Sequence, residues 1–226
     1  MQLNEYFGDW LQVIDVGELN KVVTKLNTIY QAKPVVPEYK DVFKAFTLCS
    51  MHDCKIIFLA QDPYPQKGIA TGVAFGNRQN TTELSPSLEV IKEAAINYEI
   101  PHPPIEFDVT LESWAKQGIL MLNSALTCEM NKIGSHVMLW RPFISKLLQN
   151  LSNSSPGLVY VLFGDQAQTF EPYINKNLSS IIKIHHPAYY ARTHTKMPYW
   201  VFTELNKLMK ADYGVPIRWY KELLDE

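Results

Sequence analysis

The sequence contains few cysteines and shows no excess of positive charge. Its three cysteines, Cys49, Cys54 and Cys128, lack the spacing of metal ligands, which favours reduced thiols inside a cell. Lys and Arg together number 21 and Asp and Glu number 23, so the formal net charge is -2. This balance argues against non-specific coating of nucleic acid, although it leaves room for a small DNA site with few phosphate contacts.

Long apolar runs and a basic leader are also missing. No run approaches the length that spans a bilayer, and the stretch from Met1 to Trp10 carries no basic residue. We therefore expect a cytoplasmic protein with no membrane partner. The 46% hydrophobic content excludes disorder, and 226 residues suffice for one core. We expect residues 1–226 to form a single, monomeric domain with a helical portion over 1–54.

Apolar patterning predicts both strands and helices. Short β-branched runs predict strands buried on both faces, over residues 56–60, 119–122, 158–163 and 181–184. Apolar residues at helical spacing predict helices over 15–32, 38–48, 87–97, 111–117, 140–151, 166–175 and 198–209. Three prolines predict irregular chain over 98–110. The alternation predicts an α/β fold, a three-layer α/β/α arrangement around a central, mostly parallel four-stranded sheet.

Polar or small residues follow each predicted strand directly. The pairs are Gln61-Asp62, Asn123-Ser124, Gly164-Asp165 and His185-His186. Because the carboxyl ends of parallel strands meet at one edge of a sheet, we expect these residues to surround one crevice. A carboxylate, an amide and an imidazole would meet there, without a glycine-rich phosphate loop, a cysteine nucleophile or a metal cluster.

Short motifs occur in a fixed order from about residue 55 onward. They are Gln61-Asp62-Pro63-Tyr64, Gly72-Val73-Ala74-Phe75, Ser85-Pro86-Ser87-Leu88, Leu111-Glu112-Ser113-Trp114-Ala115, Ser135-His136, Gly164-Asp165-Gln166-Ala167-Gln168 and His186-Pro187. In this order they resemble the uracil-DNA glycosylase family of bacteria, eukaryotes and viruses, whereas residues 1–54 match only loosely. The resemblance implies a monofunctional DNA repair hydrolase that flips uracil out of DNA and releases it, leaving an abasic site.

The resemblance implies catalytic roles for two side chains. Asp62 would orient the attacking water and stabilise the positive charge that develops on the sugar. His186 would donate a hydrogen bond to O2 of the departing uracil. Bond cleavage separates these charges, so an anion near the sugar and a donor near the base suit the reaction. No metal or organic cofactor is implied.

Four further residues would bind uracil. Asn123 can donate to O4 and accept from N3-H at once, whereas cytosine presents the opposite pattern. Phe75 would stack on the flipped ring, and Tyr64 would exclude the methyl group of thymine. Gln61 completes the motif around Asp62. Taken singly, Asp62 could be only a turn former, His186 a structural histidine, Asn123 a turn cap and Phe75 ordinary core.

The resemblance also implies a DNA-binding surface, made of Pro86, Ser87, Gly164, Asp165, Pro187, Ala188, Tyr190 and Arg192. Several positions depart from the family pattern. Pro65 replaces a usual histidine, Ala188 a serine and Tyr189 a proline. Tyr190 takes the place of the leucine that fills the gap left by the flipped nucleotide. Asp165 replaces a serine beside a phosphate, and we expect it to cap the following helix and so turn its charge away from DNA.

These departures leave other functions open. The pocket could be retuned for a modified pyrimidine, as in phage DNA, although Tyr64 and Asn123 argue against a larger substituent on the base. The fold could instead serve as a scaffold in DNA replication. The expected partners are uracil-containing DNA, single- or double-stranded, and an inhibitor protein or a replication protein.

Overall fold

A central four-stranded sheet organises the computed structural model, which describes residues 3–99 and 104–223. Neighbouring strands all pair in parallel, in the order β4 (Ile119–Asn123), β2 (Ile56–Ala60), β6 (Val159–Phe163) and β7 (Ser180–Ile184). Every residue of β2, β4 and β6 is buried. The four predicted strands and the predicted α/β class are therefore confirmed. The expected burial of the strand over 181–184 is wrong, because β7 is an edge strand and only Ile184 in it is buried.

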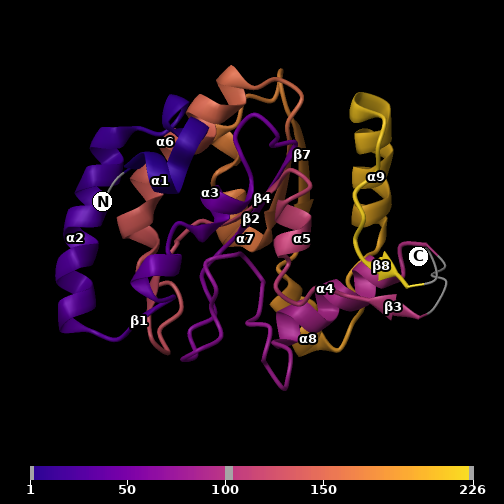
Figure 1. The fold of residues 1–226 in the computed structure, drawn as a ribbon, viewed down its shortest axis with the longest axis horizontal. Helices are drawn as coiled ribbons and strands as arrows, with labels where there is room; N and C mark the ends of the chain where they lie inside the picture. Colours follow the sequence, from indigo (N-terminus) through magenta and orange to yellow (C-terminus); the bar gives the residue numbers. More distant parts are fainter. Residues whose placement is uncertain (1–2, 100–103, 224–226) are drawn as a thin grey trace.

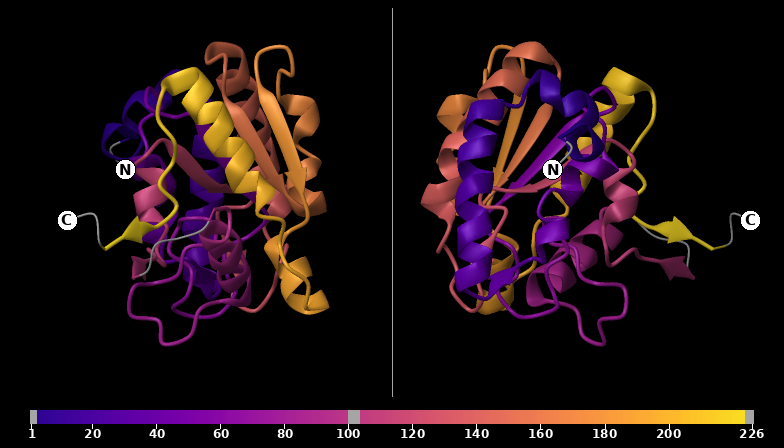
Figure 2. Two further views of the ribbon diagram at one scale, coloured as in Figure 1. Left: turned by 90° about the vertical axis from the view of Figure 1, so that its right-hand side faces the viewer. Right: turned by 60° about the vertical axis from the view of Figure 1, so that its left-hand side comes forward.

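Side chains that alternate along β2 enter two separate apolar cores, with Ile57 and Leu59 in one and Ile56 and Phe58 in the other. The first core is built with α1 (Leu3–Phe7), η1 (Gly8–Gln12), α2 (Val16–Ala32), α3 (Lys44–Leu48) and α6 (Val137–Ser154). The second is built with α4 (Pro86–Ile96), α5 (Glu112–Ala115), α8 (Pro187–Thr193) and α9 (Trp200–Tyr213). Figure 2 shows α9 across one face of the sheet and α2 on the other, which gives the three layers.

Two small antiparallel pairs lie outside the main sheet. They are β1 (Val35–Val36) with β5 (Cys128–Glu129), and β3 (Ile105–Glu106) with β8 (Lys221–Glu222). Strands of two residues carry no periodic signal, so the sequence did not predict them. The expectation of irregular chain over 98–110 is thus wrong at β3, and its prolines at 101 and 103 lie outside the described residues.

The prediction of one continuous helix over 38–48 is wrong. The chain forms a short 3-10 helix, η2 (Tyr39–Asp41), and then α3, which begins after Phe43. A Cβ placed on Gly72 would lie 1.8 Å from the carbonyl oxygen of Asp41, so the break lies against a second loop. Tertiary packing here outweighs the helical pattern.

The predicted helix over 166–175 is also wrong. Helix α7 (Gly164–Gln168) begins two residues earlier, and a separate 3-10 helix, η3 (Glu171–Tyr173), follows it. Pro172 lacks the amide proton that a continuous helix would need. Asp165 lies within the first turn of α7, while Phe163 occupies the cap position. The expected capping role of Asp165 is therefore incorrect.

Other helix ends follow local signals. Helix α2 begins where the backbone N–H of Glu18 donates to Oδ1 of Asp15 over 3.0 Å. The sequence did not predict helix α8. It starts with Pro187 and follows β7 at the carboxyl edge of the sheet (Figure 1). Over residues 3–99 and 104–223, no helix is both long and apolar enough to cross a bilayer.

Candidate active site

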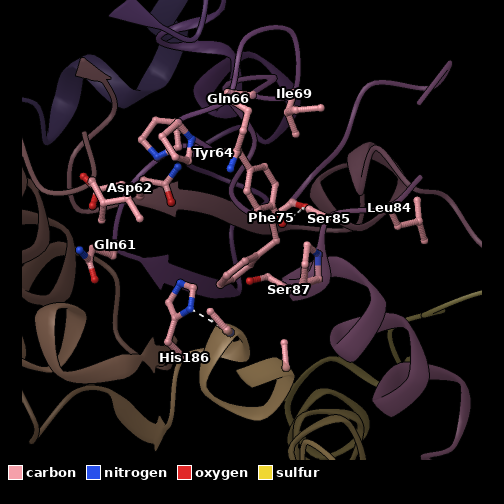
Figure 3. Close-up of a pocket in the computed structure, with 18 of the residues that line it drawn as sticks. Gln61, Asp62, Tyr64, Gln66, Ile69, Phe75, Leu84, Ser85, Ser87 and His186 are labelled. Atoms are coloured by element: carbon pink, nitrogen blue, oxygen red, sulfur yellow. Dashed lines mark hydrogen bonds between the residues drawn. The ribbon is translucent and has the colours of Figure 1, made fainter. Parts of the chain in front are cut away.

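The carboxyl ends of the parallel strands open on a cavity of about 960 Å³. Figure 3 shows Asp62, Tyr64, Phe75 and His186 around it. The predicted site residues that line this cavity are Gln61, Asp62, Tyr64, Phe75, Pro86, Ser87, Asn123, Gly164, Asp165, His186, Ala188 and Arg192. Pro187 and Tyr190 are buried in α8 instead. The parallel topology thus brings together nearly all the residues that the motifs indicate.

Asp62 follows β2 and has two unlike carboxylate oxygens. Its Oδ2 accepts a hydrogen bond of 3.0 Å from the backbone N–H of Gly134, whereas its Oδ1 is buried without a partner among the described residues. Burial raises the pKa of Asp62 above its ordinary value, and the nearby Gln61 side chain and the Gly134 amide partly oppose the shift. The unpartnered oxygen is free to accept from a bound water.

His186 follows β7 and caps α8. Its Nδ1 accepts the backbone N–H of Ala188 over 3.2 Å, which places the ring hydrogen of the neutral form on Nε2. Burial, helped by the charge of Arg192, lowers the pKa of His186 to about 4. The imidazole is therefore neutral near pH 7, with Nε2–H left as its donor.

Phe75 and Tyr64 form an aromatic wall of the cavity. The Tyr64 hydroxyl donates to the Phe75 carbonyl over 3.0 Å, and burial raises the pKa of this phenol. Phe75 has a φ of 65°, a left-handed conformation that is costly for an aromatic residue. Its ring lies 5.0 Å from that of Phe163 and 5.5 Å from that of His186, measured between centroids. These contacts hold the strained residue in one position.

Asn123 is the last residue of β4, directly beside Ala60 of β2. The next two backbone amides, of Ser124 and Ala125, donate to the carbonyls of Ala60 and Gln61 over 2.9 Å each. This pairing fixes the turn that carries the Asn123 side chain. The residue is only 6% exposed, and its Oδ1 has no partner among the described residues. A buried carboxamide in this state can bind a ligand with matching donors and acceptors.

Two helix starts form the rim of the cavity. Pro86 is exposed at the first turn of α4 and Ser87 is buried, while the Ser85 hydroxyl donates to Asn77 Oδ1 over 2.8 Å instead of capping the helix. Gly164 opens α7 with a φ of 82°, and a Cβ there would lie 2.8 Å from the His186 Cβ. A side chain at position 164 would therefore collide with the start of the His186 side chain.

The remaining rim residues come from α7 and α8. Asp165 is exposed and lines the cavity, so the expectation that its charge turns toward the helix backbone is incorrect. Arg192 is exposed on the same rim. Tyr190, at the predicted gap-filling position, is only 7% exposed and packs in the second core. Its neighbour Tyr189 is 40% exposed and lines the cavity.

Comparison with known proteins identifies the family. The family model of the uracil DNA glycosylase superfamily matches residues 46–210. The chain belongs to the uracil DNA glycosylase superfamily. A Campylobacter jejuni uracil-DNA glycosylase is 38% identical over 196 residues, covering 86% of this chain and 83% of that protein. A uracil-DNA glycosylase of Mesomycoplasma hyopneumoniae is 32% identical over 204 residues, covering 88% and 90%.

Solved structures share the fold. A variant of mimivirus UNG, crystallised in complex with UGI, superposes with a TM-score of 0.83 at 22% identity, covering 97% of this chain and 91% of that one. UNG from Nitratifractor salsuginis gives 0.65 at 20% identity, covering 87% and 95%. The α/β/α arrangement of this superfamily member is therefore confirmed independently of its sequence motifs.

Sequence reasoning missed Gly134, whose amide holds Asp62. Its loop is fastened by Glu129, which pairs with Lys33 and Lys132, and these ion pairs hold the pKa of Glu129 at about 2. The Ser135 hydroxyl accepts the Glu129 backbone N–H over 2.8 Å. The Ser135-His136 motif was a signal for this loop, but it did not indicate which backbone atom acts.

His136 belongs to a buried hydrogen-bonded network with Thr127 and Trp140. The Trp140 indole N–H donates to Thr127 Oγ1 over 2.8 Å, and Thr127 Oγ1 is also hydrogen-bonded to His136 Nδ1 over 2.9 Å. The residue is 5% exposed, and burial lowers the pKa of the His136 imidazole. Groups of three or more potential metal ligands do not occur among the described residues.

Proposed function

We propose that the chain hydrolyses the N-glycosidic bond of deoxyuridine in DNA, releasing uracil and leaving an abasic site. Membership of the superfamily supports this activity. The observation that carries it in the structure is the buried, unpartnered Oδ1 of Asn123 at the floor of a cavity with an aromatic wall. A base held in a duplex cannot reach this atom, so the nucleotide must leave the base stack.

The base would be recognised along its Watson–Crick edge. Asn123 would accept from N3–H of uracil and donate to O4, a paired contact that cytosine cannot make. Such a contact discriminates by roughly 1–3 kcal/mol. Phe75 would stack on the ring, and Tyr64 would limit the space beside C5, because its hydroxyl is tied to the Phe75 backbone.

Cleavage would develop positive charge on the sugar and negative charge on the uracil. Asp62 would hold the attacking water through Oδ1 and stabilise the sugar cation, while Gly134 fixes the carboxylate through Oδ2. His186, neutral with its hydrogen on Nε2, would donate to O2 of the departing base. Preorganised groups of this kind lower the barrier without rearranging during the reaction.

The direct test measures free uracil released from an oligonucleotide with one deoxyuridine, with thymidine and deoxycytidine oligonucleotides as controls. We expect Asp62→Asn to lower kcat by roughly 10³-fold, as for loss of a positioned acid–base group. Binding to the same DNA should persist, because the amide has the same shape. Uracil release by the variant at the rate of the unaltered protein would overturn the role of Asp62. If the unaltered protein itself releases no uracil, the proposed function is wrong.

A modified pyrimidine is a second candidate, favoured by the departures at Pro65, Asp165, Ala188 and Tyr189. The hydrogen bond between Tyr64 and the Phe75 carbonyl argues against it, because it leaves the phenol ring beside the base. Cleavage of uracil, 5-hydroxymethyluracil and modified cytosine in otherwise identical oligonucleotides decides between the two. Faster cleavage of either modified base would favour the second candidate.

A protein inhibitor is a further proposed partner. The mimivirus variant that shares this fold was crystallised in complex with UGI. We infer that a protein of that kind could bind the same rim that we assign to DNA. Loss of uracil release on addition of UGI, restored by excess substrate DNA, would support this; undiminished release at saturating UGI would exclude it.

A further inference from the structure

Two adjacent tyrosines in α8 have opposite surroundings. Tyr190 is 7% exposed within the second core, whereas Tyr189 is 40% exposed at the cavity rim. Consecutive residues of a helix point about 100° apart, because a turn contains about 3.6 residues. With Tyr190 turned into the core, the helix therefore presents Tyr189 to the cavity.

Tyr189 is paired with another exposed ring. The His185 and Tyr189 rings stack with centroids 4.5 Å apart and planes 27° apart, and both residues line the cavity. The Tyr190 ring meets Tyr189 edge to face at 5.4 Å. The buried tyrosine thus supports the exposed pair from the core side. We call His185 and Tyr189 the aromatic pair.

The aromatic pair lies next to the catalytic groups in sequence and in space. His186, Pro187 and Ala188 lie between its two members in the sequence, and both rings line the cavity that Asp62 and Asn123 also line. A DNA strand that places one nucleotide in this cavity must carry its neighbours across the rim. Bases stack on aromatic side chains regardless of their sequence, since every base has a π face.

We infer that the aromatic pair is a stacking site for the base adjacent to the flipped deoxyuridine. This site rests on the proposed function and adds a substrate contact to it. It also replaces the gap-filling role expected of Tyr190, because Tyr190 would have to leave the core to touch DNA. Arg192, one turn further along α8, is placed to contact the phosphate beside that base.

The test combines a change in the protein with a change in the substrate. Uracil release is measured on single-stranded oligonucleotides in which the base on either side of the deoxyuridine is replaced by an abasic spacer. On the contacted side, the spacer should lower kcat/KM of the unaltered protein by roughly 5- to 100-fold. Tyr189→Ala should lower kcat/KM on the full oligonucleotide by a similar factor and be insensitive to that spacer.

The effect should fall on KM rather than on kcat, because the pair binds DNA away from the scissile bond. A structural role of Tyr189, acting by displacing His186, would lower kcat instead. Tyr189→Phe keeps the ring and should stay within about twofold of the unaltered protein. Tyr189→Leu keeps an apolar side chain packed against Tyr190 but removes the aromatic ring. It should lower kcat/KM as Tyr189→Ala does, which would show that the loss does not come from a folding defect.

Tyr213→Ala is the matched control. Tyr213 is also 40% exposed, but it lies beside Lys55, at the opposite end of β2 from Gln61. This variant should respond to both spacers as the unaltered protein does. The inference is overturned if spacers on both sides lower kcat/KM of Tyr189→Ala as much as that of the unaltered protein. Absence of uracil release from every oligonucleotide by the unaltered protein would instead refute the proposed function.

Discussion

The floor and the rim of the cavity differ in how their polar atoms are satisfied. On the floor, Asp62 and Asn123 each keep a buried oxygen without a partner among the described residues. On the rim, Asp165, Tyr189 and Arg192 are exposed to solvent, which satisfies their polar groups without a ligand. The floor is therefore incomplete until substrate enters, whereas the rim is complete in the free protein.

This difference suggests that floor residues act in the reaction and that rim residues act in DNA binding. An unsatisfied buried polar atom destabilises a fold by about 1–3 kcal/mol, so such atoms persist where a ligand needs them. Rim residues carry no such cost and can change more freely. Of the positions that depart from the family pattern, Asp165, Ala188 and Tyr189 line the rim, Pro65 lines the cavity three residues after Asp62, and Tyr190 is buried in the second core. Substitutions should accordingly have large effects on rate at the floor and smaller effects on affinity at the rim.

Among the substitutions that compare the floor with the rim, loss of the His186 donor should have the largest effect. His186→Leu removes Nε2–H, and loss of one such donor to a developing anion typically costs 10²–10³-fold in kcat. DNA affinity should change little, because the imidazole acts on the departing base. Single-turnover rates at saturating DNA measure this. A reduction confined to KM would place His186 with the rim instead.

His186 should also make stability depend on pH. An unfolded histidine titrates near 6.5, whereas burial lowers the pKa of His186 to about 4 in the folded protein. Between these values the unfolded chain binds more protons, so this contribution is fully present above pH 6.5 and is lost as the pH falls to about 4. The unaltered protein should lose up to about 3 kcal/mol more than His186→Leu over this range. Parallel stability curves from urea unfolding would contradict this.

Asn123→Leu should separate activity from stability. It removes the base contact, so uracil release should fall by roughly 10- to 100-fold in kcat/KM. It also removes a buried unpartnered oxygen, so the free energy of unfolding should stay equal or rise. Kinetics and thermal unfolding of one preparation test both. A large loss of stability would show that Asn123 is structural.

Asp165→Asn should have the smallest effect, a rise in DNA affinity. The exposed carboxylate repels a phosphate across solvent, and exposed charge pairs contribute about 0.2–1 kcal/mol. We expect kcat/KM to rise by about two- to fivefold at low salt and to lose this gain at high salt. Gln166→Ala, beside it on the same rim, is the control for neutral changes. A salt-independent increase would argue against a charge effect.

The sequence predicted the sheet and the floor of the site well. Strands such as β2 are continuous apolar runs, and the parallel order brings Asp62, Asn123 and His186 to one edge whatever the loops do. Loops and short helices were predicted less well, because their form depends on distant contacts. The break before α3 lies against Gly72, and the opposite exposures of Tyr189 and Tyr190 depend on a helix that the family motif did not indicate.

The close approach of Gly164 to His186 links two segments that could otherwise change separately. A Cβ on Gly164 would lie 2.8 Å from the His186 Cβ, so any larger residue at position 164 would have to displace His186. A new turn between β6 and α7 that lacks this glycine would therefore also move His186, the residue that donates to the departing base. Libraries that vary the α7 turn should keep this glycine and randomise from Asp165 onward.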